Sequence, residues 1–111
     1  MDCVRALDFL QTRTEIDPQK IAVEGGSQGG ALSLMLAALD SRVKLCAPDV
    51  PFLSDINQLM LKANWVKVEM QRYLNTQPKL TEWRLKQHLR YFLVVKFARR
   101  LSHSKHQIVP A

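Results

Sequence analysis

Apolar and polar positions in the first half of the chain repeat at the spacings of helices and strands. Residues 2–13 carry apolar side chains at i, i+3, i+4 and i+7, which predicts an amphipathic helix bearing Cys3, Ala6, Leu7 and Leu10. Residues 21–24 are apolar, partly β-branched and followed by two glycines, as in a buried parallel strand. Residues 28–39 are apolar nearly all round, which is typical of a buried helix. Residues 43–47 predict a second strand.

This order of helix, strand, helix and strand predicts an α/β fold. Alternation at these lengths is typical of βαβ units on a parallel sheet. We expect Pro48 to end the second strand, because proline has no backbone N–H to donate to a sheet.

The second half of the chain is predicted to be helical. One helix face is formed by Val66, Met70, Tyr73 and Leu74. Thr81 is expected to cap a further helix, whose apolar face comprises Leu85, Leu89, Phe92 and Leu93. After residue 100 the chain is polar and has no periodic pattern, so we expect an irregular tail over residues 101–111.

The two halves of the chain also differ in net charge. The 111 residues carry a formal charge of +6, yet residues 1–55 hold 5 basic side chains against 8 acidic ones, and residues 56–111 hold 11 against 2. A basic helical surface over residues 80–100 suits a non-catalytic binding module that contacts an anionic membrane or a nucleic acid. The alternative is a solvated basic face, which we favour, so nucleic acid is not an expected partner.

The sequence gives little support for a membrane-spanning, secreted or metal-binding protein. No apolar run is long enough to span a membrane. The first residues lack the layout of a secretory signal, which favours a cytoplasmic protein if the natural N-terminus is present. Cys3 and Cys46 show no metal-ligand spacing, and we expect two buried thiols and no metal.

The sequence Gly25-Gly26-Ser27-Gln28-Gly29 matches G-x-S-x-G between the predicted strand and helix. In a nucleophile elbow the serine sits on a strained turn that projects its hydroxyl above the sheet. We expect steric crowding to require glycine at Gly25 and Gly29, and Gly30 to permit close packing. The Gln28 N–H, at a helix N-terminus, would suit an oxyanion. The elbow glycines are thus Gly25, Gly26, Gly29 and Gly30.

This glycine-rich turn has two other possible interpretations. It is also compatible with a plain loop or with a phosphate-binding turn at a helix N-terminus. A Walker loop is disfavoured because no Gly-Lys-Ser or Gly-Lys-Thr follows. The strand before the motif and the buried helix after it favour the elbow.

Longer motifs around the elbow resemble the acetyl xylan esterase / cephalosporin-C deacetylase family. The similar segments are residues 2–10, 16–21, 25–30 and 47–53, and they include G-G-S-Q-G-G followed by D-V-P-F-L. The resemblance runs almost unbroken over residues 2–55 and is patchy to about residue 100. These motifs are more specific than the elbow alone and argue against dienelactone hydrolases and prolyl peptidases.

The resemblance implies an α/β-hydrolase fold and a serine esterase that needs no metal or organic cofactor. The substrates implied are acetylated xylo-oligosaccharides and cephalosporin C, and the family tends to form ring-like homo-oligomers. Ser27 would be the nucleophile, and the Gln28 N–H would supply half of the oxyanion hole.

The family's catalytic Asp and His have no identifiable counterparts. No aspartate follows Asp55, and none of the three histidines, His88, His103 and His106, has the family's sequence context. We therefore expect a truncated or frame-disrupted product that is inactive alone. Its predicted organisation is a nucleophile-elbow segment (1–55), a helical continuation of the same domain (56–100) and the tail (101–111).

Overall fold

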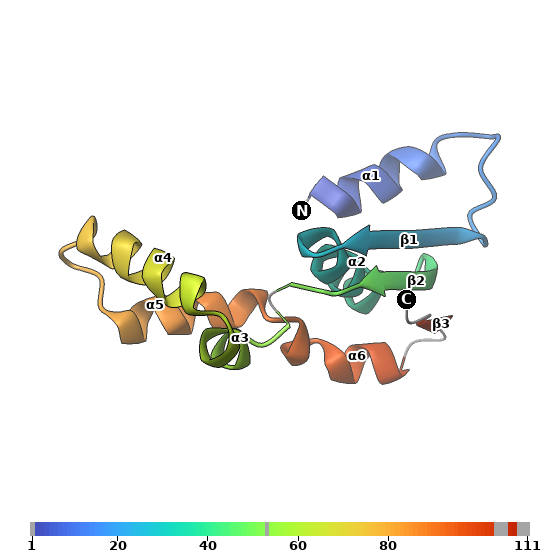
Figure 1. Ribbon diagram of the computed structural model, residues 1–111. Coiled ribbons are helices and arrows are strands. Elements are labelled where there is room, and N and C mark those ends of the chain that lie inside the picture. Colours follow the sequence, from blue (N-terminus) through green and yellow to red (C-terminus); the bar gives the residue numbers. More distant parts are fainter. Residues whose placement is uncertain (1, 53, 104–106, 109–111) are drawn as a thin grey trace. The chain divides into compact units, whose positions relative to one another are not determined.

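The computed structural model describes residues 2–52, 54–103 and 107–108 (Figure 1). It divides into two compact units. The first contains residues 1–52 together with 97–111, and the second contains residues 53–96.

The first unit is a small parallel sheet with flanking helices. Its sheet has the strand order β1-β2-β3, and both strand pairs are parallel. Figure 1 shows α1 running beside β1. The predicted α/β alternation is therefore confirmed, with the elements α1 (Asp2–Gln11), β1 (Ile21–Gly26), α2 (Gln28–Leu39), β2 (Val43–Asp49), α6 (Ala98–His103) and β3 (Gln107–Ile108).

Helix α2 forms the centre of this unit, as its apolar sequence predicts. It packs against β1, β2 and α6. The core of this unit includes the buried side chains of α2 and the fully buried Val43 and Cys46 of β2. Two leucines of α2 nevertheless remain in contact with solvent, with Leu32 44% exposed and Leu39 50% exposed. The helix is thus buried over most of its surface but not all round.

Two details differ from the sequence-based expectations. Strand β2 continues through Pro48, which lies opposite Gly25 in the register. Within the described residues β3 pairs with β2 only at Leu45 and Cys46, so the missing Pro48 N–H interrupts no bond to β3. Strand β1 is buried on one face only, because its residues alternate between buried or half-buried and exposed.

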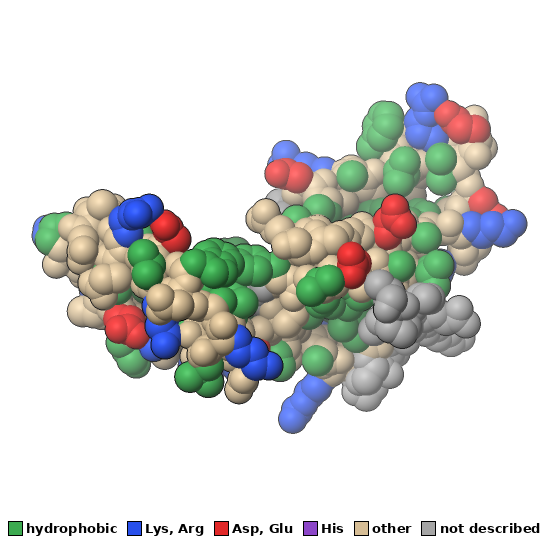
Figure 2. Space-filling model, in the orientation of Figure 1, with side chains coloured by type: hydrophobic (Ala, Val, Ile, Leu, Met, Phe, Trp, Pro, Cys, Tyr) green, Lys and Arg blue, Asp and Glu red, His purple; other side chains and the backbone are tan. Residues whose placement is uncertain are grey.

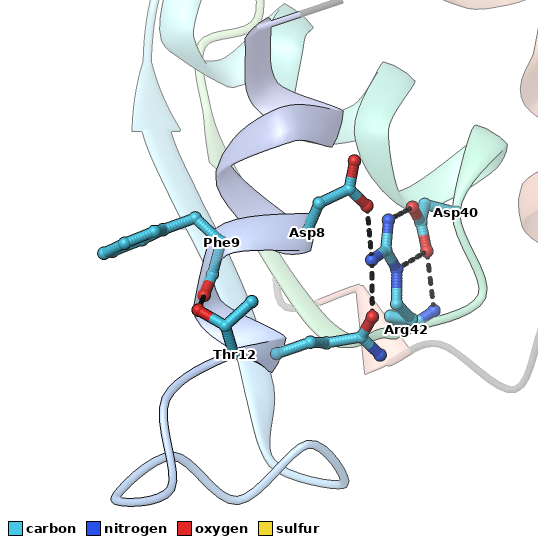
Figure 3. A network of polar contacts seen from close by, with 6 residues as sticks. Asp8, Phe9, Thr12, Asp40 and Arg42 are labelled. Carbon is cyan, nitrogen blue, oxygen red and sulfur yellow. Dashed lines mark hydrogen bonds and ion pairs between the residues drawn. The ribbon is translucent and has the colours of Figure 1, made fainter.

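An ion-pair network ties α1 to the turn between α2 and β2 (Figure 3). The Arg42 guanidinium donates to Asp40 through Nε and Nη2, and through Nη1 to Asp8, 2.8 Å away, and to Gln11, 2.9 Å away. Hydrogen bonding to Arg42 lowers the pKa of the Asp40 carboxyl. One arginine therefore links two segments that lie about thirty residues apart in the sequence.

The second unit is helical, as predicted, and has its own core. Its buried residues Ile56, Val66 and Leu93 pack with half-buried apolar side chains of the same unit. Thr81 caps α5 as expected, since its hydroxyl accepts the Arg84 N–H at 3.3 Å. The elements are α3 (Ile56–Lys62), α4 (Asn64–Asn75), α5 (Glu82–Leu89) and the short 3-10 helices η1 (Arg90–Phe92) and η2 (Val94–Lys96).

Helix α6 and strand β3 were not predicted from the sequence, and they reach into or fall within the expected irregular tail. Helix α3 lies in the predicted helical segment 56–100, but its bounds were not predicted. Asp55 starts α3, because its carboxylate accepts the backbone N–H groups of Asn57 and Gln58. No helix in the described part of the chain is long and apolar enough to cross a membrane.

Candidate active site

Ser27 lies between the last residue of β1 and the first residue of α2. Its backbone has φ 53° and ψ −115°, and the serine is exposed. A positive φ is uncommon for a residue with a side chain and costs on the order of 1–3 kcal/mol. The strand, turn and helix that the motif predicts are therefore present, with the strain located at the serine.

The glycines around Ser27 have different steric roles. A Cβ on Gly25 would lie 2.5 Å from the carbonyl carbon of Gly29, and a Cβ on Gly30 would lie 2.8 Å from two backbone oxygens. A Cβ on Gly26 would make only an ordinary contact, 3.8 Å from an Asp49 carboxylate oxygen. A Cβ on Gly29 would meet no atom within 4 Å. Crowding thus requires glycine at Gly25 and Gly30, and the expected crowding at Gly29 was wrong.

The segment after β2 holds the elbow in place. The Ser27 N–H donates to the Asp49 carbonyl oxygen at 2.9 Å, and the Phe52 N–H donates to the Ser27 carbonyl oxygen at 2.9 Å. Between them Val50 has φ 39°, an unfavourable value for a β-branched residue. The D-V-P-F sequence, which is part of the resemblance to the family, therefore holds both backbone polar groups of Ser27 in place.

The Ser27 hydroxyl is not used to cap α2. No side-chain capping hydrogen bond is made by Ser27, although serine is a favoured cap. Gln28 is the first residue of α2, so its N–H has no acceptor within the helix and lies at the positive end of the helix dipole. The exposed hydroxyl and this N–H are the two groups that acyl transfer requires from an elbow.

The described residues place no catalytic base beside Ser27. Within the described residues, no hydrogen bond joins the Ser27 hydroxyl to a histidine or a carboxylate. His88 is exposed on α5, in the second unit. His103 is the last residue of α6, where side chains are not described, and His106 lies outside the described residues.

The described residues hold no cluster of three or more metal-ligating side chains. Neither described cysteine is in a disulfide. Cys46 is buried as expected, and burial raises the pKa of its thiol. Cys3 is only half-buried, which corrects the expectation of a buried thiol, because it lines an open groove beside α1.

The chain is similar to known proteins in both sequence and fold. The sequence profile of the acetyl xylan esterase family matches residues 1–109. The chain belongs to the acetyl xylan esterase family. It is 38% identical over 102 residues to the acetyl esterase Axe7A of Xylanibacter ruminicola, an alignment that covers 90% of this chain and 22% of that protein.

Two solved acetyl xylan esterases share the fold of this family member. The enzyme from Paenibacillus sp. R4 superimposes with a TM-score of 0.82 and 37% identity, covering 98% of this chain and 34% of that one. The enzyme from Thermoanaerobacterium sp. JW/SL YS485 gives a TM-score of 0.79 and 27% identity, covering 98% and 35%. The chain therefore has part of an α/β-hydrolase-type fold and spans about a third of these solved relatives.

The family match also extends the resemblance noted from the sequence. Residues 2–55 carry the motifs that could be read directly, whereas the family profile continues to residue 109. The helical second half, where the resemblance in motifs is patchy, belongs to the same family segment.

Proposed function

We propose that Ser27 is the nucleophile of an acetyl-ester hydrolase that acts on acetylated carbohydrates. The observation that carries the proposal is the exposed Ser27 hydroxyl at a positive-φ turn between a strand and a helix, next to the N–H of Gln28. Two solved relatives that are named acetyl xylan esterases support the substrate class.

The proposed reaction is a two-step acyl transfer, in which the base comes from a part of the fold outside the described residues. Ser27 Oγ bonds to the acetyl carbonyl carbon while its proton passes to a base. The Gln28 N–H stabilises the oxyanion, and the sugar oxygen leaves with the proton as the C–O bond breaks. Water, deprotonated by the same base, then attacks the acetyl-enzyme, so that acetate is released and Ser27 regains its proton.

A second part of the proposal concerns the 111 residues by themselves. Serine is a weak nucleophile without a base, because its hydroxyl is protonated at neutral pH. The described residues place no histidine or carboxylate in hydrogen-bonding contact with Ser27. We expect these residues alone to hydrolyse p-nitrophenyl acetate no faster than their Ser27→Ala variant.

The role of Ser27 is tested by transplantation. Residues 2–55 replace the equivalent segment of the Paenibacillus acetyl xylan esterase, which supplies the remaining parts of the fold. The chimera is expected to release acetate from acetylated xylo-oligosaccharides, and Ser27→Ala to lower kcat at least about a thousandfold. Ser41→Ala, at an exposed turn after α2, is the matched control and should leave kcat unchanged.

The outcomes separate the two parts of the proposal. A folded, active chimera that tolerates Ser27→Ala would refute the nucleophile assignment. Ser27-dependent turnover by the 111 residues alone would refute only their expected inactivity, and would show that they provide their own base.

A further inference from the structure

A cavity lined by both polar and apolar side chains lies wholly within the second unit. Its volume is about 430 Å³, and its walls come from the start of α3, one face of α5, and the segment around η2. The Val95 N–H donates to the Ser54 carbonyl oxygen at 3.3 Å, which ties the η2 wall to the start of α3. The buried side chains of Ile56 and Leu93 contribute apolar surface, so the cavity is held by the core of its own unit.

The α5 wall carries an aromatic ring among cations and an amide. Trp83, Lys86, Gln87 and Arg90 recur at i, i+3, i+4 and i+7, so they share one face that runs from α5 into η1. The Leu89 side chain packs instead against the core of the second unit. Trp83 is 68% exposed, which leaves much of its indole available to a ligand. The helix face that carries Trp83 and Arg90 is therefore not the face that packs α5 against the core of the second unit.

The charges around the cavity are mostly positive. Lys86, Arg90 and Lys96 line it, against one carboxylate, Asp55. Asp55 accepts the Asn57 and Gln58 N–H groups as the cap of α3, and Lys86 pairs with Glu82 at 2.6 Å. Arg90 donates to the Gln87 side-chain oxygen at 3.2 Å. Among the described residues neither Arg90 nor Lys96 forms an ion pair with a carboxylate, so their charges are the best placed to meet an anionic ligand.

These walls fit a ligand with a flat apolar face, hydroxyl groups and one carboxylate. The C–H face of a sugar ring packs against an indole through dispersion and hydrophobic contact. Arginine and lysine bind carboxylates through charge-assisted hydrogen bonds, and amide side chains both donate to and accept from hydroxyls. A neutral sugar would leave the cations unused, and an inorganic anion would leave the indole unused.

We propose that this cavity binds an acidic saccharide, with its ring on Trp83 and its carboxylate at Arg90 and Lys96. Gln87 and Asn57 then hydrogen-bond to the sugar hydroxyls. The inference deepens the proposed function, because it rests on that function for the identity of the sugar chain. It assigns to the second unit the recognition of a uronic acid group on an acetylated polysaccharide.

The test is calorimetric titration of the 111-residue chain with two sugars that carry no acetyl group. One is xylotriose bearing a single 4-O-methylglucuronic acid, and the other is neutral xylotetraose, which has the same number of rings. The acidic sugar is expected to bind at least about tenfold more tightly, as one charged hydrogen bond predicts. Equal affinities, or displacement of the acidic sugar by inorganic phosphate at matched concentration, would overturn the proposal.

Variants locate the binding. Trp83→Ala and Arg90→Gln are each expected to weaken the acidic sugar about tenfold or more. The matched control is Arg84→Gln, because Arg84 is exposed on α5 and does not line the cavity. If circular dichroism shows that Trp83→Ala unfolds, Trp83→Phe replaces it and should weaken binding less than Arg90→Gln. Equal losses for Arg84→Gln and Arg90→Gln would refute the site.

Neither sugar carries an acetyl ester, so the titration is independent of Ser27. Selective binding of the acidic sugar would support the saccharide site even if Ser27→Ala left the chimera active. Absent binding beside a Ser27-dependent chimera would refute the saccharide site alone.

Discussion

At the level of single residues, we expect alanine substitutions at Gly25 and Gly29 to have opposite effects on stability, although the two glycines are equivalent in the G-x-S-x-G motif. A methyl group on Gly25 would overlap the backbone of Gly29, which cannot move without displacing α2. We expect Gly25→Ala to lower the free energy of unfolding by about 1–3 kcal/mol, as overpacked sites do. Urea unfolding followed by circular dichroism measures this difference.

Gly29→Ala is the matched control for Gly25→Ala. The added methyl group meets no atom within 4 Å, and alanine is up to about 1 kcal/mol more favourable than glycine in a helix. We expect unchanged or slightly higher stability. A Gly29→Ala variant as unstable as Gly25→Ala would show that both ends of the motif are crowded.

The motif predicted the strand, turn and helix at Ser27, but it did not reveal which glycines are sterically required. That depends on the path of the backbone, because the atoms that exclude a side chain from Gly25 belong to Gly29 itself. The bracing of Ser27 by Asp49 and Phe52 was equally inaccessible, since those contacts join residues more than twenty positions apart. A local sequence pattern therefore marks the elbow itself, whereas no local pattern marks the hydrogen bonds from Asp49 and Phe52 that hold it in place.

At the level of the elements, Arg42 gives the link between α1 and the α2–β2 turn a defined pH dependence. Hydrogen bonding to Arg42 lowers the pKa of Asp40 in the folded chain. This stabilisation is complete above the ordinary aspartate pKa of about 4 and is lost as the pH falls through the lower folded value. We expect the wild-type chain to unfold at a higher temperature than Asp40→Asn at neutral pH, and the difference to shrink below about pH 4.

The control for this prediction is Glu69→Gln on α4. Glu69 pairs with Arg72 at 2.9 Å, but both side chains are more than half exposed, and such pairs contribute little. Thermal unfolding from neutral pH to about pH 2 should therefore separate Asp40→Asn from Glu69→Gln. A constant difference between wild type and Asp40→Asn at all pH values would contradict the role of the Asp40 charge.

The elements that the sequence predicted are those with strong periodicity or an apolar run. Helix α2 has the predicted bounds, and Thr81 marks the start of α5. Pro48 was expected to end β2, because proline cannot donate a hydrogen bond to a neighbouring strand. That expectation applies only where a neighbouring strand lies opposite the proline, and the position at which β3 pairs with β2 is visible only in the folded sheet. Helix α3 and strand β3 are too short to form a pattern above the background of their surroundings.

At the level of the whole molecule, the candidate site is divided between what local sequence encodes and what the tertiary fold assembles. Ser27 and the Gln28 N–H come from one continuous segment, so the sequence reveals them together. A catalytic base comes from elsewhere in the fold of such enzymes, and no local pattern marks it here. The cavity of the second unit was missed for the same reason, because its walls combine α3, α5 and η2.

The first unit carries an apolar surface that is expected to make the isolated chain associate. An open groove of about 430 Å³ runs between α1, β1 and α2, and Leu10, Val23 and Leu32 are among the side chains that line it. In the described part of the chain β1 pairs only with β2, so its other edge faces no strand. Leu32 is 44% exposed in this groove. Figure 2 shows hydrophobic side chains on the visible surface of the molecule.

Leu32→Glu tests whether this groove drives association. A second copy that covers Leu32 would remove its exposed surface from water, whereas a glutamate there would have to be desolvated. We expect the wild-type chain to elute from size-exclusion chromatography as a concentration-dependent oligomer, and Leu32→Glu to raise the dissociation constant about tenfold or more. The matched control is Leu61→Glu on α3, which is 73% exposed and outside the groove. Equal effects of the two variants on the dissociation constant, or a wild-type chain that is monomeric at every concentration, would show that the groove does not mediate association.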